Sequence, residues 1–313
     1  MKLVTFLSKP YRRTDKPNDY AWNRAAQARW GVWIDNDVFD FTSKKVPTLL
    51  HLIEAGPSAW KQLGSAVRLK KNKSQRVAGR VPVSRLTLLS PIPRPPSMRD
   101  FLAFEEHSSW SWKKRGLDLP PEWYEMPVYY KGNHRTLWGP GDTIRWPSFT
   151  QKLDYELELT MVLGRSGVNI KKEKALDHIF GYAIMNDWSA RDIQAKEMLC
   201  RLGPAKGKDF GTSIGPCIVT KDELGDANGL RMQAFINDQC WSDGNSATRH
   251  WSFSDMIAHV SRDEPVFAGD LYGSGTVGRG CGLELDRWLT PGDTVTLKIE
   301  GIGELQNRVG AKP

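Results

Sequence analysis

The sequence predicts an α+β protein that is mostly β, and two observations carry this prediction. Short apolar runs alternate with turns rich in Gly and Pro, as at residues 153–163, 181–187, 216–220, 232–237 and 294–300. Helical stretches at 190–198 and 254–261 do not alternate regularly with these runs. A doubly wound parallel sheet is therefore not implied, and an antiparallel core fits better.

Composition supports a folded, intracellular chain. Of 313 residues, 40% are hydrophobic and 26% are charged, which excludes a mostly disordered or fibrous protein. No apolar run approaches the ~20 residues of a membrane span, and the first residues lack a secretory signal. We therefore expect a cytoplasmic protein with no membrane partner, whose four widely spaced cysteines are free thiols.

The first ninety residues are expected to form a small N-terminal domain. Residues 1–8 resemble a first strand, and the runs 32–34 and 38–41 flank a turn cluster typical of a hairpin. Short helices are predicted at 48–55 and 58–62, and a strand at 81–89. Four prolines between 90 and 97 form a stiff connector, so we place the boundary between domains 1–90 and 91–313 there.

Charge is spread unevenly along the chain. Residues 1–99 carry a net charge of +13, although the whole chain carries +8. The basic stretch 68–73 could hold nucleic acid or anionic lipid, or it could be a solvated loop. Because no nucleic-acid motif accompanies it, we favour the solvated loop and expect no nucleic-acid partner.

Residues 100–123 combine charge with tryptophan, and the first half is predicted to be helical up to Pro120-Pro121. Asp100 and His107 are seven residues apart. On one helix that spacing is two turns, so both side chains could face one site. The tryptophans fit either a lid over that site or an ordinary core.

Two carboxylates stand at alternate positions of the predicted strand 153–163. Glu156 and Glu158 then point the same way, where they repel each other and resist burial. A divalent cation between them removes both objections, and Mg²⁺ or Ca²⁺ prefers such oxygens. The alternative is a solvent-facing strand with two surface glutamates.

Other polar residues lie where strands or glycine-rich loops end. Asp187 ends a strand, either as a ligand or as a helix cap, and Arg191 and Gln194 share the next helix face. Lys208 lies on a glycine-hinged loop, where it could stabilise developing negative charge or simply be mobile. Glu284 is expected on a strand after the glycine-rich stretch 273–282.

Together these segments resemble the fumarylacetoacetate hydrolase family from about Met98 to Val309. The motif at 185–194, with the Asp-Tyr-Glu-Leu-Glu segment at 154–158 upstream and the segment 207–212 downstream, carries the resemblance. It implies a β-roll or β-sandwich catalytic core preceded by a small N-terminal domain. It also implies a homodimer, and a role in aromatic catabolism.

The resemblance assigns a role to each candidate residue. It implies Mg²⁺, with Ca²⁺ or Mn²⁺ as alternatives, held by Asp100, Glu156, Glu158 and Asp187. His107 would be the catalytic base, oriented by Glu284, and Lys208 would stabilise negative charge. The substrate would be held by Tyr130, Arg191, Gln194 and Thr276.

The expected activity is that of a hydrolase cleaving a carbon–carbon bond in a β-dicarbonyl acid, such as fumarylacetoacetate or an acylpyruvate. The hydrolase that gives the family its name has tyrosines that help to hold the substrate where this chain has Leu102 and Met198. This difference argues against fumarylacetoacetate as the substrate. Decarboxylases, isomerases and lyases use the same kind of metal site and stay open as alternatives. A non-catalytic protein that binds an acidic partner through its basic N-terminal region is a further alternative.

Overall fold

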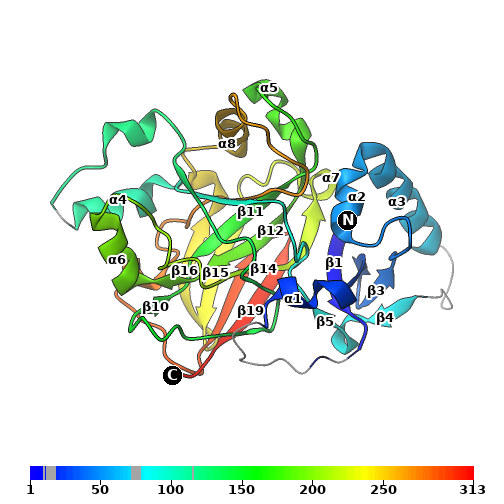
Figure 1. Ribbon diagram of the computed structural model, residues 1–313, viewed down its shortest axis with the longest axis horizontal. Coiled ribbons are helices and arrows are strands. Elements are labelled where there is room, and N and C mark those ends of the chain that lie inside the picture. Colours follow the sequence, from blue (N-terminus) through cyan, green and yellow to red (C-terminus); the bar gives the residue numbers. More distant parts are fainter. Residues whose placement is uncertain (10, 12–18, 72–78, 115) are drawn as a thin grey trace.

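The computed structural model describes residues 1–9, 11, 19–71, 79–114 and 116–313. The chain folds as predicted, into an α+β structure built on large sheets (Figure 1). In spatial order, the larger sheet contains β4 (Arg80–Pro82), β3 (Asp37–Asp40), β2 (Arg29–Ile34), β1 (Lys2–Leu7), β14 (Thr212–Thr220), β12 (Ile179–Asp187), β11 (Leu157–Leu163), β17 (Leu271–Gly273), β6 (Met98–Phe101) and β7 (Tyr129–Lys131).

A second sheet packs on the middle of the first. Its order is β16 (Gln239–Asn245), β15 (Arg231–Ile236), β18 (Thr294–Ile299), β19 (Gly303–Val309) and β9 (Thr143–Ile144). Strands β14, β12 and β11 contact this sheet, and the side chains between the two layers are buried. Tyr182 and Ile184 point into this core, and Ala183 and Met185 point to the opposite face, as the period of a strand requires.

The opposite face of the larger sheet is covered by helices of the N-terminal region. Residues Leu49, Leu52 and Ile53 of α2 (Leu49–Glu54) join Ala183 and Met185 in a second buried cluster. Helix α3 (Gly56–Lys71) follows α2, so the predicted helices at 48–55 and 58–62 are confirmed and the second is longer than expected. Part of the basic stretch 68–73 lies outside the described residues.

The N-terminal region shares a sheet with the rest of the chain. The predicted first strand is β1, which pairs antiparallel with β14 through Lys2↔Val219 and Leu3↔Ile218. Strands β2 and β3 form the predicted hairpin. The single strand predicted at 81–89 is instead β4 and β5 (Thr87–Leu88), because the chain turns at 83–85 before β5 pairs with β1.

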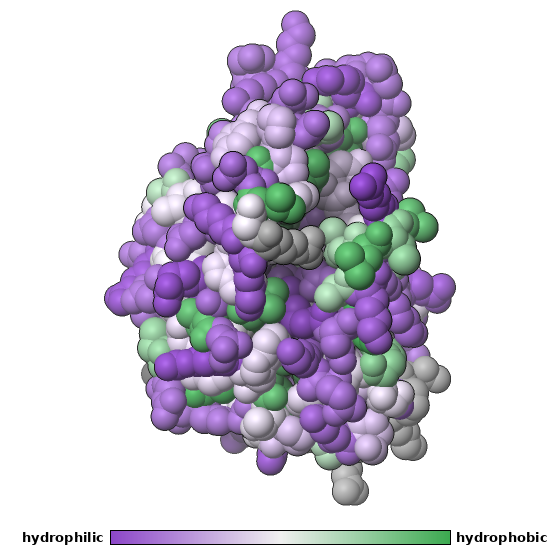
Figure 2. Space-filling view, turned by 90° about the vertical axis from the view of Figure 1, so that its left-hand side faces the viewer, coloured by the Kyte–Doolittle hydropathy of each residue, from purple (hydrophilic) through white to green (hydrophobic). Residues whose placement is uncertain are grey.

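The helices on the left of Figure 1 flank the candidate site. They are α4 (Glu105–Lys113) and α6 (Arg191–Leu199), which confirm two predicted helices. The face that carries them is hollowed, with hydrophilic residues in the hollow (Figure 2). The third predicted helix is α8 (Phe253–Val260). The shorter elements are α1 (Ala21–Arg24), α5 (Lys172–Ala175), α7 (Lys221–Leu224), α9 (Gly282–Leu285), β8 (Leu137–Trp138), β10 (Leu153–Asp154) and β13 (Ser189–Ala190).

Among the described residues, no helix is both long enough and apolar enough to cross a membrane.

Candidate active site

The structure brings the four predicted metal ligands together. Asp100 lies on β6, Glu158 on β11 and Asp187 at the end of β12, and Glu156 directly precedes β11. These strands are close neighbours in one sheet, so residues far apart in the sequence meet at one place. All four side chains are buried, and each offers an oxygen within 4.8 Å of the others.

A glycine opens the space between two of these carboxylates. Gly273 on β17 faces Asp100 and Glu158, and a Cβ at this position would collide with both carboxylates. Oδ1 of Asp100 is buried and has no hydrogen-bond partner among the described residues. Four converging carboxylates with an unsatisfied buried oxygen fit a hard divalent cation, which prefers oxygen ligands.

The electrostatics of the cluster agree with this fit. Burial, together with the charge of Asp187, raises the pKa of Asp100 well above its ordinary value. Burial and the nearby Asp100 likewise raise the pKa of Glu158 well above its ordinary value. Because like charges this close resist joint ionisation, the cluster favours either protons or a cation.

Lys208 supplies positive charge to the other side of the cluster. Its Nζ donates to Oδ2 of Asp187 at 2.6 Å and also pairs with Glu156. Burial acts to lower the pKa of Lys208, but the charges of Asp187 and Glu156 outweigh it, so the pKa is raised and the group stays an ammonium. Burial raises the pKa of Glu156, but Lys208 and Arg191 more than reverse this, so Glu156 stays ionised.

Tyr130 and Thr276 contact the ligand carboxylates. On β7, Tyr130 pairs with Asp100 of β6, and its hydroxyl donates to Oδ2 of Asp187 at 2.7 Å. The hydroxyl of Thr276 lies 3.4 Å from Oε1 of Glu158. These two of the four predicted substrate-binding residues therefore border the carboxylate cluster.

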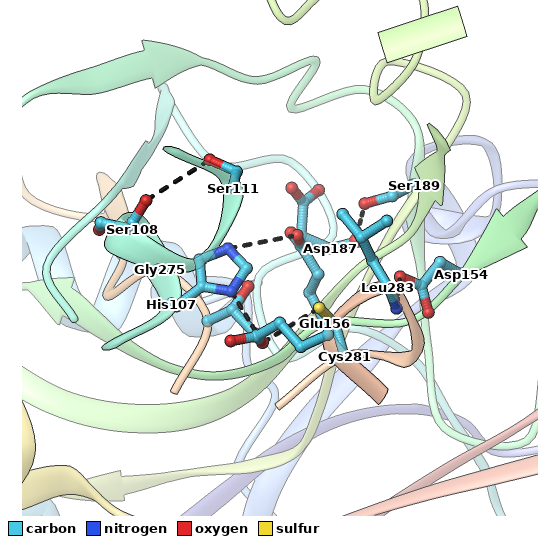
Figure 3. A network of polar contacts seen from close by, with 12 residues as sticks. His107, Ser108, Ser111, Asp154, Glu156, Asp187, Ser189, Gly275, Cys281 and Leu283 are labelled. Carbon is cyan, nitrogen blue, oxygen red and sulfur yellow. Dashed lines mark hydrogen bonds and ion pairs between the residues drawn. The ribbon is translucent and has the colours of Figure 1, made fainter. Parts of the chain in front are cut away.

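His107 and Glu284 form a hydrogen-bonded pair at the edge of the cluster. Nδ1 of His107 lies 2.9 Å from Oε2 of Glu284, and Nε2 lies 4.0 Å from Oε1 of Glu156 (Figure 3). Burial raises the pKa of Glu284, but the charge that His107 carries when protonated and this hydrogen bond outweigh it, so the pKa is lowered. The expectation that Asp100 and His107 share one helix is wrong, because Asp100 is held in β6 by pairing with β17 and His107 is on α4.

Glu284 lies on α9 rather than on the expected strand. The carboxylate of Asp154 accepts the backbone N–H of Gly282 at 2.8 Å and that of Leu283 at 3.0 Å. These bonds satisfy two of the free N–H groups at the start of α9 and stabilise a helical turn there. The backbone N–H of Arg279 also donates to Oε1 of Glu284 at 3.1 Å, which fixes the carboxylate facing His107.

Arg191 is buried and tied to acidic residues of the site. Its Nε lies 2.8 Å from Oδ2 of Asp154, and its Nη2 lies 2.8 Å from Oε1 of Glu156. Nη1 donates to Oε1 of Gln194 at 3.0 Å, so the predicted shared helix face is confirmed. In this arrangement Arg191 orients Glu156 and Gln194.

Sequence reasoning missed two residues of the site, Asp154 and Cys281. Asp154 is fully buried and joins β10, α6 and α9 through the bonds described above. Its place two residues before the Glu-x-Glu pair was the available signal. Cys281 donates its S–H to Oε2 of Glu284 at 3.2 Å, and its position three residues before Glu284 in the glycine-rich stretch was the corresponding signal.

Comparisons with known proteins find related sequences and structures. A sequence model of the family described as fumarylacetoacetate (FAA) hydrolase, C-terminal, matches residues 98–310. Oxaloacetate tautomerase YisK of Bacillus subtilis is 33% identical over 195 residues, and this match spans 62% of the chain and 63% of that protein. The mitochondrial oxaloacetate tautomerase fahd2 of Xenopus laevis is 30% identical over 259 residues, which are 82% of the chain and 76% of that protein.

A solved structure shows the same fold over the full length of both chains. The fumarylacetoacetate hydrolase of the psychrophilic Exiguobacterium antarcticum matches with a TM-score of 0.73 and 26% sequence identity, and each chain is covered to 100%.

Proposed function

Because the chain belongs to the fumarylacetoacetate hydrolase family, we propose that it is a metal-dependent enzyme that interconverts the keto and enol forms of a 2-oxo dicarboxylic acid of the oxaloacetate class. The observation that supports this proposal is the His107–Glu284 pair, whose free nitrogen faces a cluster of four buried carboxylates. The names of the relatives from Bacillus subtilis and Xenopus laevis point to the same substrate class.

Asp100, Glu156, Glu158 and Asp187 would hold a divalent cation, for which we propose Mg²⁺, with Mn²⁺ or Ca²⁺ as alternatives. When bound, this ion would polarise a substrate carbonyl and acidify the neighbouring C–H.

The chain's own residues then carry the proton. Glu284 accepts the N–H at Nδ1 of His107, which leaves the lone pair at Nε2 to act as base. Nε2 takes the proton from the carbon between the two carbonyl carbons and returns it to the carbonyl oxygen, so the enol forms without water or loss of atoms. The ammonium of Lys208 stabilises the negative charge that develops on that oxygen.

Carbon–carbon hydrolysis, the activity that the sequence predicts, is the second candidate. The same Nε2 could instead deprotonate a water molecule that attacks the carbonyl carbon, and the chain shares its fold with a fumarylacetoacetate hydrolase. The two reactions differ in their products, because hydrolysis yields two acids and consumes one water.

We would incubate the enzyme with oxaloacetate and several acylpyruvates in Mg²⁺, with and without EDTA. The absorbance of the enol would be followed, and the products would be separated by chromatography. Metal-dependent acceleration of enol–keto exchange with no new acid is the expected result. Release of two acids would replace the tautomerase proposal by the hydrolase, and loss of CO₂ would replace it by a decarboxylase.

A further inference from the structure

A second group of ligating side chains lies beside the carboxylate cluster. His107, Cys281 and Glu284 offer a nitrogen, a sulfur and an oxygen that all lie within 4.8 Å of one another. The proposed proton transfer uses His107 and Glu284 and leaves the thiol without a role. This donor set differs in kind from the four carboxylates, because thiolate and imidazole favour softer ions than Mg²⁺.

Two of the three donor atoms already approach the third closely. The thiol and Nδ1 of His107 approach the same oxygen, Oε2 of Glu284, at 3.2 and 2.9 Å. Ligands of tetrahedral Zn²⁺ lie 2.0–2.3 Å from the ion, and hence about 3.5 Å from one another. A metal ion could therefore take the place of the two bridging protons after shifts of roughly half an ångström.

The surroundings allow a cation to reach and occupy this point. The side chain of His107 is 14% exposed, whereas that of Glu284 is 1% exposed and Cys281 is buried. Arg191 is a nearby cation, and its charge is offset by Asp154 and Glu156, each at 2.8 Å. Three protein ligands and one side open through His107 match the arrangement of an open zinc site.

We propose that His107, Cys281 and Glu284 form a second metal site, selective for a thiophilic divalent cation such as Zn²⁺, and that its occupation inhibits the enzyme. When the ion binds, the thiol releases its proton to solvent and the imidazole proton moves from Nδ1 to Nε2. No oxidation takes place. Protonated Nε2 no longer serves as a base, and this inhibitory consequence rests on the proposed function.

Co²⁺ tests the site without any measurement of activity. Cobalt bound to a thiolate gives a strong sulfur-to-metal charge-transfer band in the near ultraviolet, which an all-oxygen site lacks. The Mg²⁺-saturated protein would carry Cys200→Ser and Cys240→Ser, because these two cysteines are exposed. We expect a saturable band that Cys281→Ser abolishes.

Cys217→Ser is the matched control, since Cys217 is also buried but lies in the core on β14, with its S–H toward the carbonyl of Ile302. The band is expected to survive this change. Absence of the band in the starting protein, or its persistence in Cys281→Ser, would overturn the proposed site.

His107→Gln keeps the test decisive where Cys281→Ser does not fold. In this variant the band is expected to remain, and the affinity for Co²⁺ should fall at least about tenfold. An unchanged affinity would exclude His107 as a ligand and overturn the three-residue site.

Zn²⁺ inhibition tests the functional consequence separately. With Mg²⁺ in excess, the Zn²⁺ concentration for half-inhibition should rise at least about tenfold in Cys281→Ser relative to Cys217→Ser. An equal Zn²⁺ sensitivity of the two variants would overturn the inhibitory role. If the protein lacked tautomerase activity altogether, the cobalt band would still decide whether the site exists.

Discussion

Lys208 is the ammonium group that faces the buried carboxylates from inside the protein. It contacts Glu156 and Asp187, whereas Asp100 and Glu158 lie on the other side, around Gly273. The positive charge that Lys208 supplies to the cluster therefore lies beside Glu156 and Asp187 only. The other half is where a cation is needed most, and where the pKa values of the two carboxyls are raised most strongly.

Replacing His107 by Gln should remove the proposed base and leave the carboxylate cluster in place. We expect kcat for enol–keto exchange to fall at least roughly 10²-fold, because a positioned general base contributes about that much. Isothermal titration with Mn²⁺ should show an unchanged affinity at the carboxylate site. His51→Gln, on the exposed surface of α2, is the control and should retain activity. A fully active His107→Gln enzyme would refute the mechanism.

Glu158→Gln should weaken metal binding and stabilise the metal-free protein. The change removes a ligand, so the Kd for Mn²⁺ should rise at least about tenfold. It also removes a buried carboxyl whose ionisation is disfavoured by burial and by Asp100. The metal-free variant should therefore melt at a higher temperature than the metal-free wild type. Calorimetry of both proteins with and without EDTA measures this, and a lower melting temperature of the metal-free variant would contradict the argument.

At the scale of elements, the sequence predicted the strands and helices that carry the ligands. An apolar run that ends at Asn186-Asp187 located β12, because a strand buried on both faces reads as a continuous apolar run. The alternation of Glu156 and Glu158 with apolar residues located β11. The pattern failed at Asp100 and Glu284, whose local structure depends on partners far along the chain. Asp100 lies in a strand because β6 pairs with β17, and α9 forms because Asp154 accepts the N–H groups at its start. Neither partner can be inferred from the local pattern of apolar residues.

Asp154 connects three elements, so Asp154→Asn should lower both the stability of the protein and kcat, although Asp154 does not contact the proposed base. The variant loses the ion pair that neutralises buried Arg191, and we expect it to lose about 3 kcal/mol of stability. Its amide also fails to accept both N–H groups of α9, so Glu284 should orient His107 less well and kcat should fall more than KM rises. Urea unfolding and steady-state kinetics test both effects. Asp222→Asn, on the exposed surface of α7, is the comparison.

At the scale of the whole molecule, the N-terminal region and the site share one sheet and one buried cluster. Leu3 and Ile53 pack with Val162 and Phe180 of the strands that lead to the ligands. We therefore expect a single cooperative unfolding transition by calorimetry. A fragment of residues 91–313 should aggregate, because β14 would lose its pairing with β1. A folded, active fragment would contradict this expectation.

The predicted homodimer is tested by light scattering of the full chain.

Metal should also change how the stability of the whole protein depends on pH. Asp100 and Glu158 have raised pKa values in the folded state, so folding retains protons that the unfolded chain releases above about pH 4. The metal-free protein should therefore lose stability as pH rises from about 4 towards the raised values. Mg²⁺ should reduce this loss, and so should Glu158→Gln. Melting curves at several pH values measure it, and identical pH profiles for Glu158→Gln and the wild type without metal would refute it.

The pairing of β1 with β14 also constrains how the protein is made. Strand β1 ends at Leu7, and its partner β14 starts at Thr212, about 200 residues later. At a synthesis rate of roughly 5–20 residues per second, β1 waits roughly 10–40 s on the ribosome before its partner emerges. During that interval its apolar side chains lack their final cover. We therefore expect the nascent chain to bind a ribosome-associated chaperone during this interval.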